Sequence, residues 1–450
     1  MIRRVEADGP ASKPASVGAP TFIDVFAGCG GLSLGLKRAG WHGLFAIEKD
    51  RFAFDTLSSN FPIDSGPLSY SWPEAIERTP WDIAELLRTK SEALEALAGT
   101  VDLLAGGPPC QGFSHAGRRR PDDPRNRLFE AYLELVRIVR PRVVLIENVR
   151  GFTSSFDRRG HDGITNFAET LHDRLDADYD TVSAIVRASD LGVPQSRSRF
   201  FLVGVRKGEL AGDGLSRFFD DLHQHTAAFL APRGLPRRPT ARDAIGDLEV
   251  GHNGTVPCDD SPGFDAIDYQ EPRSAYQIFI RDGHEGRPSD TRLARHRPDI
   301  RDRFASIIRS SCEEGRLNVS ISPETRKAHG LKKMAIRVMD PLSPAPTITS
   351  LPDDLLHYSE PRTLTVRENA RLQSFPDWFK FKGKYTTGGH LRVKEVPRFT
   401  QVANAVPPLI AEQIGLRLIS LLGLDRVDMG GERPTDNGEG VLVSAQLAAE

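Results

Sequence analysis

The chain has 450 residues, of which 39% are hydrophobic and 27% charged, and its formal net charge at pH 7 is -2. This length favours two domains, and the near-neutral charge excludes a nucleic-acid binder with an overall basic surface, though not one with a local basic face. No apolar run is long enough to cross a bilayer, and the four cysteines form no CxxC pair, which argues against a zinc site or a disulfide framework and fits a reducing cytoplasm.

The first predicted strand, Phe22–Phe26, leads into a glycine turn at Gly28–Gly31 and then into residues 32–38, which have helical spacing. A strand, a glycine turn and a helix form a nucleotide-type site in which backbone N–H groups face the ligand. A second short strand ends in Glu48, about 20 residues past the first glycine, where a carboxylate can accept hydrogen bonds from ribose hydroxyls. Ser33 stands where a dinucleotide fingerprint has its third glycine. The pattern favours a nucleoside cofactor over a purely structural turn, and it leaves both NAD and S-adenosylmethionine open.

A further buried strand, predicted at residues 101–105, ends in two glycines and two prolines, and Cys110 follows directly. The prolines fix φ and supply no N–H, so the backbone that carries Cys110 is stiff where it leaves the sheet. Open α/β sheets bind ligands beyond the carboxyl ends of their strands, which places Cys110 over that crevice. A cysteine buried in a tight turn is the alternative, but the glycines, the prolines and the polar Gln111 favour a nucleophile.

More strands are predicted at residues 143–146, 181–186 and 200–205, with a helix at residues 128–139. Strands that alternate with helices imply a mostly parallel, doubly wound sheet.

Two further groups can complete a site with Cys110. Glu147 follows a buried strand at the same crevice, and Arg197 and Arg199 alternate at the start of a later strand, so both arginines point to one face. A thiol, a carboxylate, a fixed pair of cations and a nucleoside site indicate covalent catalysis on an electron-poor ring. The alternative for Glu147 and Arg199 is an ion pair that ties two strands together.

The composition changes between about Gly208 and Pro361, where Gly, Pro, Asp and Arg become frequent and helical patterns are short. Between Thr291 and Asp340, twelve Lys and Arg residues stand against six Asp and Glu residues. This local excess is either a solvated face or a surface that follows phosphates. We predict a second domain here.

Two helices are predicted after this region. Thr365 and Glu368 form a capping box that begins the first helix, which ends at Ser374–Asp377. The second helix, at residues 409–422, is apolar and needs a sheet face to bury it, which places it back on the first domain.

These segments, in this order, resemble the motifs of cytosine-5 DNA methyltransferases, and the resemblance covers most of the chain. The matching segments are Asp24–Gly31, Gly107–Ser114, Glu147–Val149, Gly192–Arg199, Leu364–Asp377 and Asn404–Pro408. The resemblance implies an α/β fold of the S-adenosylmethionine methyltransferase type: a Rossmann-like, doubly wound, mostly parallel sheet. The resemblance also implies a smaller, irregular target-recognition domain inserted before the C-terminal helix.

The domain boundaries are predicted on the same basis. Residues 1–20 are expected to form a disordered lead-in, and residues 425–450 a flexible tail. Residues 21–207 together with 401–424 are expected to form the catalytic and cofactor-binding domain, and residues 208–400 the DNA-binding domain.

The resemblance implies S-adenosylmethionine as methyl donor, no metal, and a cytosine flipped out of duplex DNA as acceptor. Cys110 then adds to C6 of the ring and raises the electron density at C5. Glu147 holds the N3 and N4 edge, and Arg199 contacts both O2 and Glu147. Arg197 supports the site or a nearby phosphate. The base that removes the C5 proton is not identified by the sequence.

The cofactor pocket implied by the resemblance has Glu48 on the ribose and Asp82 and Ile83 near the adenine. Its residues are Phe26, Gly28, Gly30, Gly31, Glu48, Asp82, Ile83, Pro108, Leu128 and Asn404. Residues 113–127 resemble the mobile loop that closes over DNA. One departure is Ala403, where the family usually has glycine; alanine would be strained there if the position needs a positive φ.

The leading hypothesis is the modification enzyme of a bacterial restriction–modification system. We expect it to be a cytoplasmic monomer that associates with the nucleoid through double-stranded DNA, without a membrane, and pairs functionally with a cognate restriction endonuclease. C5 methylation of RNA is a second hypothesis, which only an assay with both substrates decides. A catalytically silent DNA-binding scaffold is opposed by the intact set Cys110, Glu147 and Arg199. An NAD oxidoreductase does not explain the Pro-Pro-Cys-Gln stretch.

Overall fold

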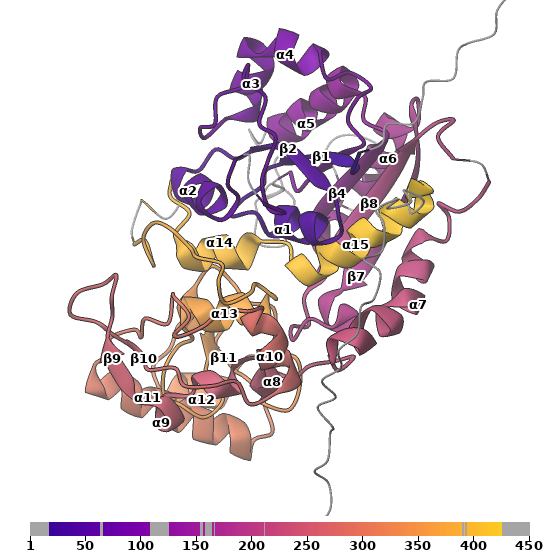
Figure 1. Cartoon of the computed structure of the whole chain (residues 1–450). Coiled ribbons are helices and arrows are strands. Elements are labelled where there is room, and N and C mark those ends of the chain that lie inside the picture. Colours follow the sequence, from indigo (N-terminus) through magenta and orange to yellow (C-terminus); the bar gives the residue numbers. More distant parts are fainter. Residues whose placement is uncertain are drawn as a thin grey trace, which may run out of the picture.

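A six-stranded sheet lies at the centre of the computed structural model of this chain (Figure 1). Its strands, in chain order, are β1 (Thr21–Val25), β2 (His42–Ile47), β3 (Leu103–Gly106), β4 (Val143–Val149), β7 (Tyr179–Arg187) and β8 (Ser198–Arg206). In space they follow the order β2-β1-β3-β4-β8-β7. Strands β2, β1, β3 and β4 pair in parallel, whereas β8 runs antiparallel to both β4 and β7. The predicted α/β fold with a mostly parallel sheet is therefore confirmed.

The structure describes residues 18–63, 66–108, 126–153, 156–157, 164–165, 167–210, 212–388, 391 and 394–424. Cys110, most of the predicted lead-in, nearly all of the loop predicted at residues 113–127 and the tail predicted at residues 425–450 lie outside these ranges.

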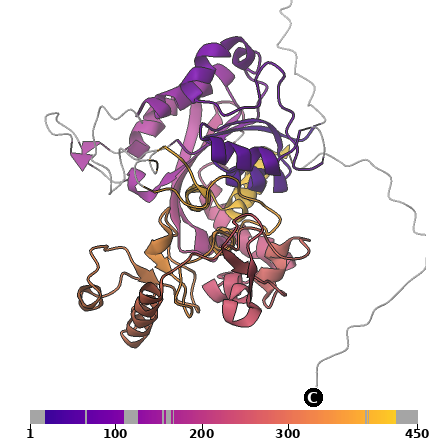
Figure 2. The same ribbon diagram turned by 90° about the vertical axis from the view of Figure 1, so that its left-hand side faces the viewer.

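Helices cover both faces of the central sheet (Figures 1 and 2). One face packs against α1 (Gly31–Arg38), α7 (Phe218–Leu230) and α15 (Pro408–Leu421). The other face packs against α3 (Ile83–Thr89), α4 (Ser91–Glu95), α5 (Asn126–Val139) and α6 (Phe167–Leu175). Because both faces are buried, the parallel strands read as nearly continuous apolar runs, and this made them visible in the sequence.

Helix α15 returns to the sheet-forming part of the chain, but it packs mainly against α1 and α7 instead of directly on strands. Glycines make this close approach of helices possible. A Cβ atom at Gly35 of α1 would lie 2.4 Å from Cβ of Ala411, and one at Gly415 of α15 would lie 2.8 Å from Cβ of Ala39. Both distances are shorter than side chains tolerate, so the first and last described helices touch backbone to backbone.

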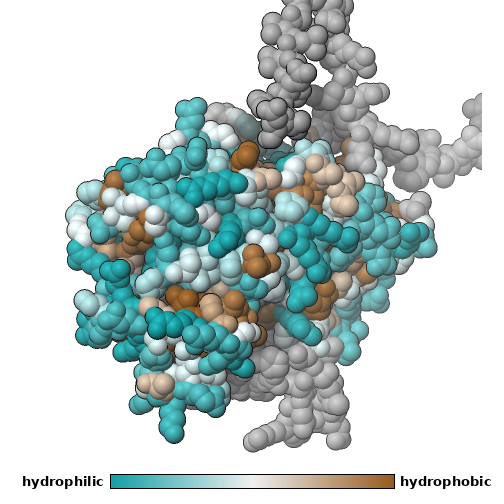
Figure 3. All heavy atoms as spheres, turned by 90° about the horizontal axis from the view of Figure 1, so that it is seen from below, coloured by the Kyte–Doolittle hydropathy of each residue, from teal (hydrophilic) through white to brown (hydrophobic). Residues whose placement is uncertain are grey.

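The second region (residues 241–356) lies below the sheet in Figure 1 and consists of short elements. Its helices are α8 (Ala241–Ile245), α9 (Val250–Asn253), α10 (Ala275–Arg281), α11 (Pro298–Glu313) and α12 (Pro323–Ala328). Its strand pairs are β9 (Thr255–Pro257) with β10 (Asp265–Ile267), and β11 (Arg337–Val338) with β12 (Leu355–Leu356). The molecular face in Figure 3 is mainly hydrophilic, with hydrophobic residues in small separate groups. Two small cores lie within this region, and others of its residues, such as Ile245 and Tyr276, belong to the large core that α1, α7 and α15 share.

Three α-helices and one strand pair of the described residues remain. They are α2 (Arg51–Asn60), the strand pair β5 (Phe156–Asp157) and β6 (Ile164–Thr165), α13 (Val366–Leu372) and α14 (Arg398–Asn404). In Figure 1, α13 and α14 lie between the sheet and the second region. The predicted domain boundaries at 207/208 and 400/401 stay predictions. Helix α7, which follows the first boundary, packs against α15 and β7 of the sheet-forming part, and the second boundary falls inside α14.

The start of α13 confirms the predicted capping box. The Thr365 hydroxyl accepts a hydrogen bond from the backbone N–H of Glu368 at 3.2 Å, and the Glu368 carboxylate accepts one from the N–H of Thr365 at 2.6 Å. Ala403 lies in α14 with a helical backbone and is not among the residues with positive φ. The strain considered for an alanine at this position therefore does not arise.

Buried charges connect α13 to its surroundings. The Arg371 guanidinium donates to Asp377 at 2.9 and 2.8 Å and to Asp247 of the second region at 2.5 Å, and all three side chains are inaccessible to solvent. Burial alone would lower the pKa of Arg371, but the charges of Asp377 and Asp247 outweigh burial and hold this pKa well above its ordinary value. This cluster ties the helix to the second region at a point where water is excluded.

No helix in the part of the chain that the structure describes is both long enough and apolar enough to cross a membrane.

Candidate active site

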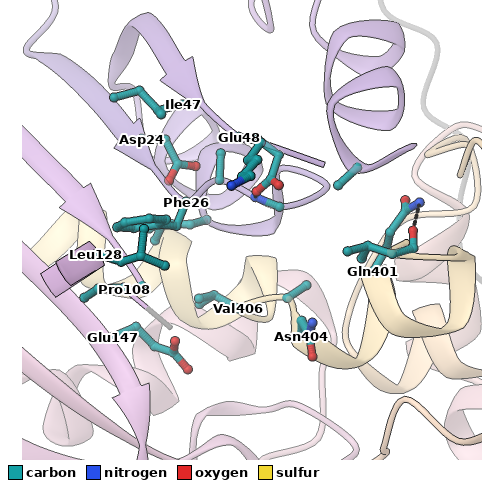
Figure 4. Close-up of a pocket in the computed structure, with 18 of the residues that line it drawn as sticks. Asp24, Phe26, Ile47, Glu48, Pro108, Leu128, Glu147, Gln401, Asn404 and Val406 are labelled. Carbon is teal, nitrogen blue, oxygen red and sulfur yellow. Dashed lines mark hydrogen bonds between the residues drawn. The ribbon is translucent and has the colours of Figure 1, made fainter. Parts of the chain in front are cut away.

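A cavity of about 420 Å³ opens where the parallel strands end, bounded on its other side by the link between α14 and α15 (Figure 4). Parallel strands bring their carboxyl ends to one edge of a sheet, so residues from distant motifs meet there. Eleven of the residues predicted from the sequence line this cavity: Phe26, Gly28, Glu48, Asp82, Ile83, Pro108, Leu128, Glu147, Arg197, Arg199 and Asn404. In Figure 4, Glu48 and Glu147 lie well apart in this space.

The alternation of side chains along the strands explains why charged groups meet at this edge. On β4, Val143 and Leu145 belong to the core beneath α1, and Glu147 comes next on the same face. On β8, Phe201 and Val203 belong to this core, and Arg199 precedes them in the same alternation. The apolar pattern therefore fixes which face the two charged side chains occupy.

Glu147 and Arg199 form an ion pair across β4 and β8. The register pairs Arg199 with Val149, so Arg199 and Glu147 are diagonal neighbours on one face. The Nε atom of Arg199 lies 2.9 Å from Oε1 of Glu147, and the two side chains keep 14% and 12% of their surface exposed. A Cβ atom at Gly107 would lie 3.1 Å from Oε2 of Glu147, so a side chain there would press on the carboxylate.

Arg197 is almost fully buried, at 2% exposure, and lines the same cavity. Its Nε atom has no hydrogen-bond partner among the described residues. Burial, together with the like charge of Arg199, lowers the pKa of Arg197 well below its ordinary value. A buried cation with an unused donor is costly unless a ligand supplies an acceptor.

Asn148 of β4 holds the chain at Pro108, just after the end of β3. The side-chain amide of Asn148 donates to the carbonyl oxygen of Pro108 at 3.0 Å, and its Oδ1 atom accepts from the N–H of Val149 at 2.7 Å. Pro108 stands two residues before Cys110, which itself lies outside the described residues. The last described residue before the predicted nucleophile, Pro108, is therefore held by the strand that carries Glu147.

The other end of the cavity is formed by the turn after β1 and by the end of β2. Phe26 and Gly28 both have left-handed backbone angles, with φ of 59° and 57°. The Glu48 carboxylate accepts hydrogen bonds from the N–H groups of Gly28 at 2.9 Å and of Asp50 at 2.7 Å. Burial raises the pKa of Glu48. Asp82 caps α3, with its carboxylate accepting from the N–H of Ala84 at 3.0 Å.

Gly30 and Gly31 do not line the cavity, although the sequence grouped them with the cofactor residues. A Cβ atom at Gly30 would lie 2.5 Å from the Phe61 ring, and one at Gly31 would lie 2.3 Å from the carbonyl oxygen of Val406. These glycines let α1 approach α2 and the start of α15. Both glycines thus pack the wall behind the cavity, and their predicted part in cofactor binding stays a prediction.

Asp24 and Trp81 line the cavity but were absent from the predicted site. Asp24 is 1% exposed; Ser33 donates to its Oδ2 at 2.5 Å, and its Oδ1 finds no partner within the described ranges. Burial raises the pKa of Asp24 from 3.8 to about 7. The sequence signal for Asp24 was a carboxylate in an otherwise apolar strand. The signal for Trp81 was its place directly before the predicted pair Asp82 and Ile83.

The raised pKa of Asp24 predicts a pH-dependent stability of the ligand-free protein. The folded state holds this proton more tightly than the unfolded chain, so the contribution is fully present below about pH 4 and is lost as the pH rises through about 7. As the pH rises from 5 to 8, we expect deprotonation of Asp24 to lower the free energy of unfolding by ~3 kcal/mol. Asp24→Asn should remove this part of the pH dependence of the free energy of unfolding. Urea unfolding at several pH values measures it.

The matched control for this measurement is Asp55→Asn, an exposed carboxylate on α2. This variant is expected to keep the wild-type slope. Equal slopes for wild type and Asp24→Asn would show that the Asp24 carboxyl does not change its protonation on folding in this range.

Comparisons with known proteins agree with the geometry of the site. A family profile described as C-5 cytosine-specific DNA methylase matches residues 20–420. The chain is 32% identical over 406 residues to "Type II methyltransferase M.DdeI" of Desulfomicrobium norvegicum, covering 88% of each chain. It is 29% identical over 435 residues to "Type II methyltransferase M.XorII" of Xanthomonas oryzae pv. oryzae, covering 90% of this chain and 85% of that one.

A solved structure shares the fold. It is the crystal structure of a prophage-encoded protein from E. coli that is described as a DNA modification methyltransferase. The two structures superpose with a TM-score of 0.60 at 26% identity, over 90% of this chain and 100% of the other.

Proposed function

Because the chain belongs to the C-5 cytosine-specific DNA methylase family and is thus a DNA cytosine-5 methyltransferase, we propose that it methylates a flipped cytosine in a specific duplex sequence through a covalent adduct of Cys110. One observation carries this proposal: the pair of Glu147 and Arg199, held 2.9 Å apart at one end of a cavity whose other end has the features of a nucleoside site. The Type II relatives support a role in a restriction–modification system, acting on DNA in a bacterial cytoplasm.

The cavity residues fit S-adenosylmethionine, which this family uses. Phe26 and Trp81 offer aromatic surface for an adenine, and Glu48 offers a buried carboxylate for ribose hydroxyls. Asp24 adds an acceptor oxygen that has no partner among the described residues and that suits the cationic end of the molecule. When bound, S-adenosylmethionine supplies an electrophilic methyl group.

The reaction proceeds at the cytosine through groups of the chain. The Cys110 thiolate adds to C6, and Glu147 holds the N3 and N4 edge so that the negative charge that develops in the ring is balanced by protonation at N3. Electron density then reaches C5, which accepts the methyl group. A base removes the C5 proton, Cys110 leaves as the thiolate while the C5–C6 double bond re-forms, and N3 releases the proton that it had taken up.

The two arginines complete this site. Arg199 keeps the Glu147 carboxylate in place and offers guanidinium N–H groups to O2 of the base. Arg197 brings to the same cavity a buried donor that no described residue accepts, which suits an acceptor on the substrate, such as a phosphate oxygen next to the flipped base.

A labelling experiment tests the proposal. The protein and its Cys110→Ala variant are each incubated with radiolabelled S-adenosylmethionine and mixed-sequence duplex DNA, with RNA in parallel. We expect label at cytosine C5 of DNA for the wild type and none for the variant, because the adduct at C6 is what activates C5. Bisulfite sequencing of the product then gives the recognition sequence.

The outcomes separate the alternatives. Equal incorporation by the two proteins would contradict the role of Cys110, and label in RNA alone would favour the RNA hypothesis. No label in either substrate would favour a silent scaffold. DNA with 5-fluorocytosine at the target should trap a covalent complex, because fluorine cannot leave as a proton does.

A further inference from the structure

Two buried glutamines, Gln195 and Gln373, form hydrogen bonds between segments whose relative position matters for the proposed chemistry. Gln195 directly precedes the stretch that carries Arg197 and Arg199, and Gln373 ends α13. Both side chains are inaccessible to solvent. Neither lines the cavity, and neither has a role in the reaction steps above.

Gln195 links α13 to the second region. Its Nε2 atom donates to the side-chain oxygen of Gln373 at 2.9 Å and to the carbonyl oxygen of Leu372 at 3.2 Å. Its Oε1 atom accepts from the backbone N–H of Ile348 at 3.0 Å. Both amide protons and the oxygen of this side chain are thus used in bonds to other segments.

Gln373 continues the connection to the cofactor end of the site. Its Nε2 atom donates to the carbonyl oxygens of Val402 at 2.9 Å and Ala405 at 3.2 Å. Ala405 itself lines the cavity, together with its neighbours Asn404 and Val406. The wall formed by the link between α14 and α15 is therefore hydrogen-bonded to Gln373.

The bonds all run in one direction. The N–H of Ile348 donates to Gln195, Gln195 donates to Gln373, and Gln373 donates to Ala405. Amides bonded head to tail in a dry interior polarise one another, so each bond strengthens the next. Breaking any one bond leaves a buried polar group without its partner, which the interior opposes.

Hydrogen bonds hold the segment around Ile348 to the residues beside Gln195 and to the rest of the second region. The carbonyl oxygen of Ala345 accepts from the N–H of Ser196 at 2.8 Å, and the N–H of Ala345 donates to Pro194 at 3.0 Å. On the other side, the Asn318 side chain of the second region donates to the carbonyl oxygen of Pro344 at 3.2 Å. A displacement of the second region is thus transmitted to the stretch that begins the arginine strand.

We infer that Gln195 and Gln373 are positioning residues that couple the second region to the Glu147–Arg199 pair and to the cofactor wall. DNA held by the second region then favours the same arrangement of the wall that the cofactor favours. The inference rests on the proposed function, which assigns the cofactor to the cavity, and on the predicted DNA-binding domain at residues 208–400, which contains the second region. It predicts that each ligand raises the affinity for the other by the same factor.

Calorimetry tests this coupling with S-adenosylhomocysteine as the probe for the cavity. Its Kd is measured with and without duplex DNA that carries the recognition sequence. We expect DNA to lower the Kd at least fivefold for the wild type, and less than twofold for Gln195→Met and Gln373→Met. The matched control is Gln413→Met, a buried glutamine of α15 that donates to Leu191 and Leu409 away from this connection and should keep the wild-type factor.

The double variant distinguishes coupling from damage to the fold. If the two glutamines act as one connection, Gln195→Met with Gln373→Met loses no more coupling than either single variant. Equal coupling factors in wild type and both single variants, or no coupling in the wild type, would overturn the inference. Absence of methylation by the wild type would instead overturn the proposed function.

A measurement on the unaltered protein covers the case in which the variants do not fold. S-adenosylhomocysteine alone should slow hydrogen–deuterium exchange in the peptide that contains Ile348, which has no place in the cavity lining. Unchanged exchange of that peptide, with protection at residues 404–406, would also overturn the inference.

Discussion

Glu147→Gln is expected to lower kcat by about 10³-fold with a much smaller change in KM for DNA. Glutamine keeps the shape of the side chain but removes the charge that balances protonation at N3 and that pairs with Arg199 at 2.9 Å. Charge stabilisation in a site closed to water is worth far more in the transition state than in the ground state, and loss of one such group costs about 10²–10⁴-fold in rate. Steady-state methylation kinetics on the identified duplex measure this effect.

The matched control is Glu412→Gln on α15. Glu412 is also buried and paired with an arginine, Arg233 at 2.8 Å, but it does not line the cavity. We expect its kcat to stay within about threefold of the wild type, a change of less than ~0.7 kcal/mol in the barrier. If Glu147 only tied β4 to β8, both variants would lose stability alike and Glu147→Gln would keep its kcat.

Arg371→Met is expected to give the largest loss of stability of any single change considered. The substitution leaves Asp247 and Asp377 buried without the guanidinium that now bonds both, and among the described residues Asp377 keeps one ion pair, with Arg281 at 3.3 Å. Removal of one partner from a buried charge cluster costs about 3–5 kcal/mol, because the remaining charges stay uncompensated. Urea unfolding at pH 7 measures the change.

The control for this variant is Arg137→Met on α5, whose partner Glu134 lies at 3.2 Å and where both side chains are half exposed. Solvent screens such a pair, and its loss should change the free energy of unfolding by no more than about 0.5 kcal/mol. A change of under 1 kcal/mol for Arg371→Met would contradict a stabilising role for the cluster around α13.

The sequence was most informative where one local pattern determines the structure. The parallel strands were predictable because both faces of the sheet are covered, so each strand is apolar along its length. The capping box of Thr365 and Glu368 was predictable because its two residues lie within one helical turn. Glu147 was predicted at the crevice because it follows a buried strand, and Arg197 and Arg199 were predicted on one face because side chains alternate along a strand.

Features that depend on distant partners were not predictable. Gly31 was grouped with the cofactor residues, but its need for glycine comes from Val406, which only the folded chain brings beside it. Asp24 was part of a recognised motif, yet its unused oxygen in the cavity depends on neighbours that leave Oδ1 without a bond within the described residues. The bond between Arg371 and Asp247 likewise joins residues 124 positions apart.

The contact between α1 and α15 has a consequence for synthesis on the ribosome. Helix α1 is complete at Arg38, but the helix that touches it at Gly35 begins only at Pro408. At bacterial and eukaryotic elongation rates, synthesis of the chain from α1 to α15 takes roughly 20–70 s, and during this time the apolar face of α1 that packs on α15 is uncovered by it. The wall of the cavity formed by Asn404, Ala405 and Val406 emerges at the same late stage. The cavity of a nascent chain is therefore incomplete until the segment up to α15 has been made.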